Sequence, residues 1–241
     1  MLRRFLSLFD SLHACSAALA FAFLATACGG LGTPRSLPSP CAQEQHRGEA
    51  TYYDPNRMGN CGYPVDEQGW AVAAINSAEY AGSAACGACA RVRGPKGELT
   101  VRIIDRCPGC KVGDLDLSRP AFSAIADLRA GRVPLTWAFV PCEVQGNIRY
   151  HFKEGSNRYW TAVQIREHRL PIASVEARNS QGNWVELTRK NYNYFVRSGL
   201  GAGPYTFRVR DVEGGVVEDE GLAFQEGAEM EGRAQFSGCR P

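Results

Sequence analysis

Residues 99–118 read LTVRIIDRCPGCKVGDLDLS, and this stretch decides how the first half of the chain folds. Its first part, residues 99–105, alternates polar and apolar side chains, which predicts a half-buried strand. Two aspartates, Asp105 and Asp116, bracket a segment rich in cysteine, proline and glycine. Carboxylates accept hydrogen bonds from sugar hydroxyls, so the pair indicates a cleft that holds a glycan. No third carboxylate evidently completes the acid-and-base pair that a glycosidase uses.

The surrounding sequence predicts more strands and one helix. Short runs broken by glycine predict strands at residues 48–53, 70–75, 89–94, 99–105 and 135–141. Residues 118–125 predict a helix with Ser118 as its N-cap and Pro120 in its first turn, and Phe122, Ile125 and Ala126 form an apolar face. Asp105 would then end a strand and Asp116 would precede a capped helix, so both could open onto one groove.

The second half of the chain has the pattern of a small antiparallel sandwich. Strands are expected at regular spacing, at residues 148–152, 160–166, 172–178, 184–187 and 205–212. Residues 180–183 predict a hairpin turn, and Trp184 and Phe207 are expected in the core. The join at residues 143–146 is very short, which predicts two domains held in a fixed relation.

Composition excludes some classes of function. The chain has 241 residues and a formal net charge of +2, which gives no general argument for nucleic-acid binding. Basic residues outnumber acidic ones over residues 147–210, whereas residues 211–231 contain no Lys or Arg. A locally basic face favours acidic polymers through long-range attraction. An ordinary solvated face explains the same pattern, so both interpretations stay open.

The N-terminus is typical of an export signal. Arg3 and Arg4 precede an apolar run at residues 16–27 that is too short for a stable membrane anchor. Residues 25–27 (Ala-Thr-Ala) fit ordinary signal cleavage, whereas Cys28 followed by two glycines resembles a bacterial lipid-attachment site. We expect a signal peptide at 1–27, a Pro/Ser-rich tether at 28–47, and a secreted or cell-surface lipoprotein.

The cysteines agree with an exported protein. Without Cys15 in the signal and Cys28 at the new terminus, eight cysteines remain, at positions 41, 61, 86, 89, 107, 110, 142 and 239. An even number in an oxidising compartment favours disulfides. Two Cys-x-x-Cys pairs also suggest zinc, but none of the four histidines lies near those pairs in the sequence. We expect disulfides and no metal.

Several motifs in a fixed order resemble the expansin family, most closely its microbial two-domain members. These are residues 48–53 (GEATYY), 59–62 (GNCG), 85–89 (ACGAC), Asp105, 116–118 (DLS), 150–160 (YHFKEGSNRYW) and 191–195 (NYNYF). The resemblance covers about residues 48–217. It implies a six-stranded double-psi β-barrel at 48–143, then an immunoglobulin-like, cellulose-binding β-sandwich at 147–241. It also implies non-hydrolytic loosening of plant cell walls.

The resemblance also implies roles for individual residues. Asp116 matches the essential acid, and Asp105 and Thr51 match its polar supports. Tyr52 follows Thr51 as in relatives and is expected to bind carbohydrate. Tyr159, Trp160 and Tyr192 match a cellulose-binding surface, with Lys153 as its basic neighbour. The implied disulfides are Cys61–Cys86, Cys89–Cys142, Cys107–Cys110 and Cys41–Cys239. Cys107 departs from the family, because some bacterial relatives carry a cleft tyrosine there.

Several alternatives to these roles remain open. Asp116 could merely structure the loop before Ser118, and Asp54 or Asp114 could supply a missing base, although turn aspartates usually bond their own backbone. Trp160 could be a core residue. Consecutive strand residues point to opposite faces, so Tyr159 and Trp160 can share a platform only in a loop or bulge.

Three functions therefore compete. The favoured one is a monomeric, non-enzymatic expansin that needs no cofactor and whose partners are cellulose and matrix polysaccharides of plant walls. The second is an endoglucanase with a base opposite Asp116. The third is a peptidoglycan lytic transglycosylase, which resembles the rare-lipoprotein-A type in its barrel and lipoprotein signal.

Overall fold

The computed structural model describes residues 37, 39–55, 58–64 and 71–239. Contacts divide the chain into Met1–Thr33, which lies outside the described residues, and Pro34–Pro241, which forms one compact unit. The signal peptide predicted at 1–27 and the lipid-attachment site predicted at Cys28 also lie outside the described residues. Among those that are described, no helix is long and apolar enough to span a membrane.

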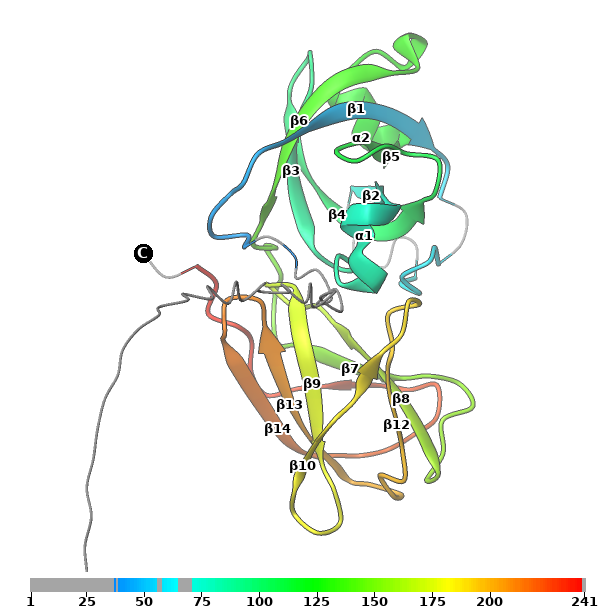
Figure 1. Cartoon of the computed structure of the whole chain (residues 1–241), viewed down its shortest axis with the longest axis vertical. Helices are drawn as coiled ribbons and strands as arrows, with labels where there is room; N and C mark the ends of the chain where they lie inside the picture. The colour runs from blue at the N-terminus through cyan, green and yellow to red at the C-terminus, as the bar shows by residue number, and fades with distance from the viewer. Residues whose placement is uncertain (1–36, 38, 56–57, 65–70, 240–241) are drawn as a thin grey trace, which may run out of the picture. The chain divides into compact units, whose positions relative to one another are not determined.

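A closed six-stranded barrel forms the first part of the unit (Figure 1). Neighbouring strands follow the order β1-β5-β2-β4-β3-β6, with parallel pairs β1–β5 and β2–β4 and antiparallel pairs elsewhere. The strands are β1 (His46–Tyr53), β2 (Val72–Asn76), β3 (Cys89–Arg93), β4 (Glu98–Cys107), β5 (Leu115–Ser118) and β6 (Val133–Val140).

Short helices accompany the barrel. They are α1 (Ser77–Tyr80), η1 (Ala81–Ser83), α2 (Arg119–Ile125) and η2 (Leu128–Ala130). Helix α2 forms as predicted and buries Phe122 and Ile125, but Ser118 makes no side-chain cap. Ser118 is instead the last residue of β5, and its hydroxyl lies 3.5 Å from the backbone nitrogen of Val72. Ser118 is thus the N-cap residue of α2 as expected, but its hydroxyl does not cap the helix, because the sheet determines where this hydroxyl points.

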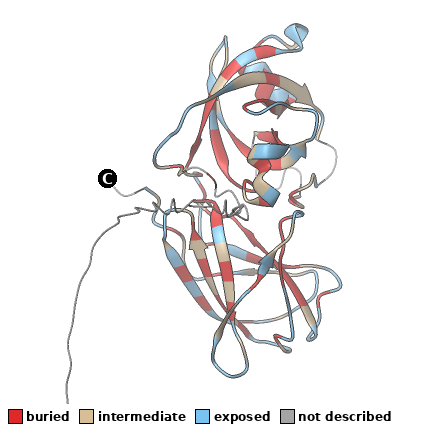
Figure 2. Ribbon diagram, viewed as in Figure 1, coloured by how far each residue is buried: buried red, intermediate tan, exposed pale blue. Residues whose placement is uncertain are grey.

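Alternation along the strands builds the barrel core. Leu115 and Leu117 of β5 are fully buried, whereas Asp116 between them is partly exposed. Ala50 of β1 and Ile103 of β4 are likewise fully buried in the same cluster. Figure 2 shows buried residues on the strands and exposed residues mainly in loops. Strand β5 thus turns its two leucines toward the core and Asp116 away from it.

Two sheets form the second part of the unit. The four-stranded sheet has the order β10-β9-β13-β14, and the five-stranded sheet has the order β11-β12-β8-β7-β15. Phe152, Phe195 and Phe207 are buried in the sandwich core. The strands are β7 (Arg149–Phe152), β8 (Trp160–Arg166), β9 (Ile172–Arg178), β10 (Trp184–Glu186), β11 (Thr188–Arg189), β12 (Phe195–Ser198), β13 (Tyr205–Asp211), β14 (Val216–Leu222) and β15 (Glu229–Glu231). The predicted order of a barrel and then a β-sandwich is confirmed.

Hydrogen bonds join the barrel to the sandwich. The side-chain amide of Asn60 donates to the Asn191 carbonyl at 3.1 Å, and the Tyr80 hydroxyl donates to the same carbonyl at 2.6 Å. Arg102 of β4 forms a buried ion pair with Glu167 at 2.8 Å. The bonds to Asn191 fix the loop that precedes β12 to the barrel, and the ion pair fixes Glu167, directly after β8, to β4.

Four disulfides join the eight cysteines discussed above: Cys41–Cys239, Cys61–Cys86, Cys89–Cys142 and Cys107–Cys110. These are the pairs that the family resemblance implies, and they leave none of those thiols to bind zinc. Cys107–Cys110 closes the turn directly after β4. Cys41 is bonded to Cys239 and β1 begins at His46, so the end of the expected tether at 28–47 belongs to the folded unit.

Other sequence expectations differ from the structure in detail. Trp184 is not a core residue, because the Arg178 and Arg208 guanidiniums lie over its partly exposed ring at 4.8 Å and 3.9 Å from its centroid. Asp116 lies within a strand and not in a loop before a helix. Strands β5, β11, β12, β14 and β15 were not predicted. The hairpin turn at residues 180–183 joins the antiparallel strands β9 and β10 as expected.

Candidate functional site

Four neighbouring strands place Thr51, Asp116, Ala74 and Asp105 in one row across the barrel wall, here called the acidic rung. Thr51 of β1 is in register with Asp116 of β5, Asp116 with Ala74 of β2, and Ala74 with Asp105 of β4. Residues in register on adjacent strands project from the same face of a sheet. The two carboxyls are therefore side by side, two strand spacings or about 10 Å apart at their Cα atoms. Ala74 lies between the two aspartates, and its small side chain leaves the space between their carboxyls open.

Backbone amides hold Asp105 in place. Its Oδ1 accepts hydrogen bonds from the backbone N–H groups of Asn60 at 2.6 Å and Arg106 at 2.7 Å. Gly59 makes this approach possible: its φ is +57°, and a Cβ there would lie 2.9 Å from the Asp105 Cβ. The position and the two donors together fix the orientation of this carboxylate.

Asp116 has a perturbed proton affinity. Burial raises the pKa of its carboxyl above the ordinary range, and nearby Asp105 acts in the same direction. The Thr51 hydroxyl donates to Asp116 Oδ1 at 2.5 Å, which opposes that rise, as does Arg132. A carboxyl with a raised pKa stays protonated to higher pH, so it can both donate and accept hydrogen bonds there.

Tyr53 is a further residue of this face that sequence reasoning missed. It follows Thr51 by two positions in β1, so both side chains leave the same face of the strand. Burial raises the pKa of its phenol, and the negative charges of Asp105 and Asp116 raise it further. Its buried hydroxyl has no hydrogen-bond partner among the described residues. The alternation of side chains along β1, with a period of two residues, was the sequence signal that could have identified Tyr53.

The three aromatic residues Tyr159, Trp160 and Tyr192, here called the aromatic platform, lie on the sandwich. The Asn157 side-chain oxygen accepts from the backbone N–H groups of Tyr159 at 2.9 Å and Trp160 at 3.2 Å, so Tyr159 sits in a tight turn and Trp160 begins β8. Tyr159 is 73% exposed and Tyr192 is 38% exposed. Trp160 is partly buried against Ala162, Tyr194 and Val196.

Two hollows adjoin the aromatic platform, and Tyr192 lines both. The first, of about 540 Å³, contains Trp160 together with Lys190 and Arg197. The second, of about 620 Å³, contains Lys153 and also Asn60, whose backbone N–H holds Asp105. Trp160 and Tyr192 are thus brought together, Lys153 adjoins Tyr192, and Tyr159 lines neither hollow.

Comparison with known proteins identifies the family. Residues 45–137 match a family model described as lytic transglycolase. Expansin-YoaJ of Bacillus subtilis (strain 168) is 35% identical over 189 residues, which cover 75% of this chain and 80% of the relative. The chain belongs to the expansin family. Expansin-like protein 1 of Dictyostelium discoideum is 30% identical over 225 residues, covering 87% of this expansin and 79% of the relative.

Solved structures agree. The crystal structure of the apo Clavibacter michiganensis expansin superimposes with a TM-score of 0.75 at 34% identity, covering 82% of this expansin and 100% of that chain. A point mutant of that protein, solved in complex with cellohexaose, matches equally well. The expected fold class, a double-psi β-barrel followed by a β-sandwich, is confirmed.

Three further residues named from the sequence have contacts of their own in this expansin. The side chain of Tyr52 leaves β1 on the face opposite to that of Thr51. There its ring packs on Phe122, with 4.9 Å between the ring centroids, and its hydroxyl donates to the Leu128 carbonyl. Strand alternation turns Tyr52 away from the acidic rung, so its expected sugar-binding role stays a prediction separate from the rung. Asp54 and Asp114, considered as bases, are already engaged.

Asp54 and Asp114, the two aspartates considered as possible bases, each have hydrogen-bond partners in the structure. Asp54 forms a bidentate pair with Arg119 at 3.0 Å and 3.1 Å. Asp114 is buried and accepts from the backbone N–H groups of Glu49 and Lys111, so it structures the turn before β5. Both carboxylates thus have partners in this expansin.

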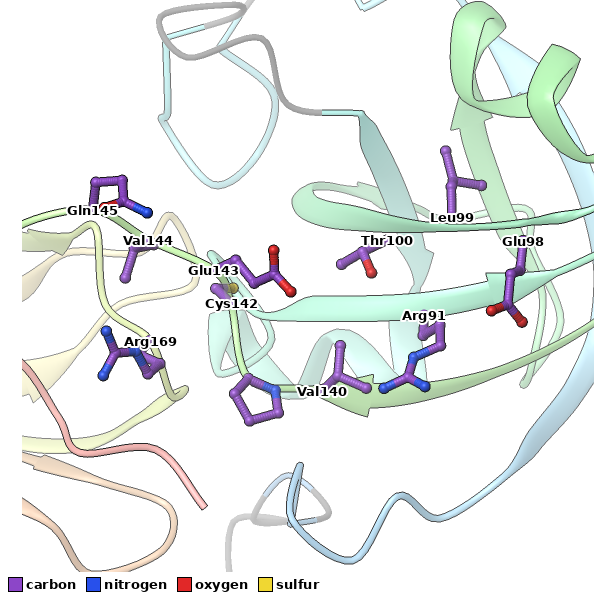
Figure 3. Close-up of a pocket in the computed structure, with 11 residues that line it drawn as sticks. Arg91, Glu98, Leu99, Thr100, Val140, Cys142, Glu143, Val144, Gln145 and Arg169 are labelled. Carbon is purple, nitrogen blue, oxygen red and sulfur yellow. The ribbon is translucent and has the colours of Figure 1, made fainter. Parts of the chain in front are cut away.

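A larger hollow of about 810 Å³ lies outside the site (Figure 3). Arg91 and Glu98 come from β3 and β4, and Val140 and Glu143 from the end of β6 and the segment after it. None of the described residues that line it is aromatic, so this lining lacks the flat apolar surface on which sugar rings stack. Among the described residues, no cluster of three His, Cys, Asp or Glu could hold a metal ion.

Proposed function

We propose that this expansin loosens plant cell walls without hydrolysis, by binding cellulose and displacing non-covalent contacts between wall polysaccharides. In this proposal the barrel, residues 48–143, carries the loosening site, and the sandwich, residues 147–241, holds the polymer. The observation that carries it is the acidic rung: Asp105 and Asp116 project side by side from one face of the barrel wall.

Hydrolysis needs a different arrangement of carboxyls. An inverting glycosidase protonates the leaving oxygen from one side of the sugar and activates water from the other side. Two carboxyls on the same face of one sheet approach a sugar from the same side. Asp54 and Asp114 are bonded to other groups, so neither supplies the opposing base.

Displacement of hydrogen bonds uses the groups that the rung offers. A protonated Asp116 both donates and accepts, the Thr51 hydroxyl does the same, and Asp105 accepts. Exchanging one hydrogen bond for another changes the free energy little, by about 1 kcal/mol or less, so neighbouring chains can be released and rebound. An equilibrium binder supplies no net work, and the movement of the wall must come from external stress.

The aromatic platform retains the polymer during this exchange. Sugar rings present flat C–H faces, and Trp160 and Tyr192 offer large apolar planes with few rotamers to immobilise. Lys153 in the adjoining hollow adds donors for sugar hydroxyls. The cellohexaose bound to the Clavibacter michiganensis expansin mutant supports a β-linked glucan as the ligand class.

A second candidate function is lytic transglycosylation of peptidoglycan. The match of residues 45–137 to a family model described as lytic transglycolase favours it. Cleavage of this kind would use Asp116 as the proton donor, which its raised pKa permits. The two candidates share the acid and differ in whether a covalent bond is broken.

One pair of assays separates them. The purified mature protein is incubated with cellulose and with peptidoglycan while soluble sugar is measured, and the same protein is applied to clamped plant wall strips under load. We expect extension of the strips, lost in Asp116→Ala, and no soluble sugar. Sustained sugar release that Asp116→Ala abolishes would instead establish an enzyme.

The same proposal includes export and a monomeric state. The proposal also includes lipid attachment at Cys28, which mass spectrometry of the mature N-terminus tests. A lipidated Cys28 would carry the mass of a diacylglyceryl group that is lost in Cys28→Ser. Cleavage after Ala27 without added mass would leave a freely secreted protein.

A further inference from the structure

The Cys107–Cys110 disulfide is more exposed than two of the other three bridges. Both of its cysteines are partly exposed, and the Pro-Gly pair between them is exposed. By contrast, all four cysteines of Cys61–Cys86 and Cys89–Cys142 are buried. A thiol in solution attacks a disulfide only where it reaches a sulfur atom. In the folded protein, Cys107–Cys110 is therefore open to attack while the two buried bridges are shielded.

The same bridge closes a very small ring. Its cysteines are 3 positions apart, compared with 25, 53 and 198 positions for the other bridges. The entropy that a disulfide removes from the unfolded chain grows with the length of the loop that it closes. Cys41–Cys239 is also partly exposed, but it joins positions near the two ends of the folded unit. The fold therefore loses least stability when Cys107–Cys110 opens, so folding opposes its reduction least.

Positive charge flanks the bridge in the sequence. Arg106 directly precedes Cys107 and Lys111 directly follows Cys110, and both are exposed. In the part of the chain that the structure describes, neither has a carboxylate oxygen within 4.0 Å. Cations beside a cysteine stabilise its thiolate. Exchange expels one cysteine as a thiolate, so this setting favours opening of the bridge.

The remainder of the loop between β4 and β5 is held by other contacts. Asp114 accepts hydrogen bonds from the backbone N–H groups of Lys111 at 3.0 Å and Glu49 at 2.8 Å. The backbone N–H of Gly113 donates to the Glu79 carboxylate at 2.9 Å. Residues 111–114 are therefore attached to β1 and α1 whether the bridge is closed or open.

The stretch 107–110 lies at the end of β4, next to the acidic rung. Cys107 is the last residue of β4, and the Cys110 N–H donates to its carbonyl at 3.3 Å, a bond within the stretch itself. Arg106 supplies one of the two backbone N–H groups that orient Asp105, at 2.7 Å. The other comes from Asn60. Opening the bridge therefore frees the end of the strand on which one of these two donors lies.

We propose that Cys107–Cys110 is a thiol-exchange site, at which a dithiol opens the bridge and releases the end of β4 that positions Asp105. A thiolate of the dithiol bonds to one cysteine sulfur, and the electron pair of the S–S bond goes to the other cysteine. The second thiol of the dithiol then displaces the first cysteine. In sum, the bridge gains two electrons and two protons, and the dithiol becomes a disulfide.

The consequence for wall loosening rests on the proposed function of the acidic rung, whereas the exchange itself does not. The two parts therefore have separate readouts: labelling of the thiols and amide exchange for the site, and wall extension for its effect.

Differential labelling tests the exchange. Free thiols of the mature protein are blocked with N-ethylmaleimide, the protein is treated with dithiothreitol at neutral pH, and new thiols are labelled with deuterated N-ethylmaleimide. Peptide mass spectrometry then locates the labels. We expect Cys107 and Cys110 to be labelled at dithiothreitol concentrations about ten-fold lower than those that open Cys61–Cys86 or Cys89–Cys142. Labels that appear at these bridges together, as the fold is lost, would overturn the proposal.

Amide hydrogen exchange tests the release of β4. The N–H groups of Arg106 and Cys110 should exchange about ten-fold faster after selective reduction, because local opening governs their protection. Those of Glu49 and Gly113 are the internal control and should exchange at the same rate in both states, since their acceptors are Asp114 and Glu79. Unchanged exchange at Arg106 and Cys110 would show that the bridge does not hold the strand end.

Wall extension tests the effect on function. Reduced protein is alkylated, freed of reductant and compared with oxidised protein and with Cys107→Ser/Cys110→Ser, which opens the stretch without a bulky label. We expect both open forms to extend wall strips about three-fold or more slowly, because displacing a positioned group by about 1 Å removes much of its effect. Cys41→Ser/Cys239→Ser lacks a bridge far from Asp105 in the sequence and is the matched control. It should extend strips like wild type until dithiothreitol slows it in the same way.

Failure of this inference is distinguishable from failure of the proposed function. If extension continues unchanged once Cys107 and Cys110 are labelled, the proposed function stands and the inference is wrong. If the oxidised protein does not extend wall strips, the proposed function is wrong, and labelling with amide exchange still decides whether the bridge is an exchange site that holds β4.

Discussion

The Thr51 hydroxyl donates a hydrogen bond of 2.5 Å to the Asp116 carboxyl across the parallel pair β1–β5. The two residues are in register, so the bond is built into the sheet and does not depend on a loop. Thr51 opposes the effect of burial on the pKa of Asp116. A neighbouring strand therefore lowers the proton affinity that burial gives to the proposed loosening acid.

Replacing Thr51 by valine should raise the pKa of Asp116 further. Valine keeps the shape of threonine but removes the donor that stabilises the ionised carboxylate. We expect a loss of about 1 kcal/mol in the free energy of unfolding, measured with urea. Carbon NMR of the Asp116 carboxyl reports the pKa directly. Thr136→Val, in β6, is the control, and an unchanged Asp116 titration in Thr51→Val would refute the coupling.

Stability should depend on pH through Asp116 in a defined direction. Its pKa is raised in the folded state, so folding favours the protonated form. The stability that this group contributes is fully present below its unfolded-state pKa and is lost as the pH rises through the folded-state pKa. Urea unfolding of wild type and Asp116→Asn from about pH 3 to about pH 8 measures the difference. The wild-type protein should lose stability relative to the variant as the pH rises.

Wall extension should follow the same titration if protonated Asp116 exchanges hydrogen bonds with the polymer. The wild-type protein should then extend wall strips best at acidic pH and lose activity as Asp116 ionises. Activity that rises with pH over this range would contradict a role for the protonated carboxyl.

Tyr53→Phe should separate stability from function. The variant removes a buried hydroxyl that has no partner among the described residues, so it should increase the free energy of unfolding by about 1 kcal/mol. If the hydroxyl meets the polymer, the same change should reduce wall extension while cellulose retention stays unchanged. A purely structural Tyr53 would give no loss of extension, and a loss of stability would show that the hydroxyl has a partner.

The sequence predicted the barrel and the sandwich because each depends on short alternating runs and on a set of motifs that spans both. Strand β5 escaped notice because its four residues, Leu115–Ser118, are too short for a period to emerge beside Gly113 and Pro120. Its position decides the site, since β5 brings Asp116 beside Thr51. Pairing between distant strands is a tertiary property, and no local pattern encodes it.

Errors in single residues have the same origin. Tyr52 was expected to face the sugar and Tyr53 was not considered, although alternation from Thr51 places Tyr53 on its face. Trp184 was expected in the core, but Arg178 of β9 and Arg208 of β13 cover its ring instead. Composition cannot distinguish burial by apolar side chains from partial cover by guanidiniums.

Trp160 and Trp184 form a matched pair for testing the platform. Both are partly exposed and both begin a strand of the sandwich, but on different sheets. Trp160→Ala should reduce cellulose retention about ten-fold, because loss of one stacking surface costs on the order of 1.5 kcal/mol. Trp184→Ala should leave retention unchanged, because its ring is already covered by Arg178 and Arg208. Retention is measured as the bound fraction on crystalline cellulose, with circular dichroism confirming that both variants fold. Equal losses in the two variants would mean that general destabilisation, and not the platform, controls cellulose binding.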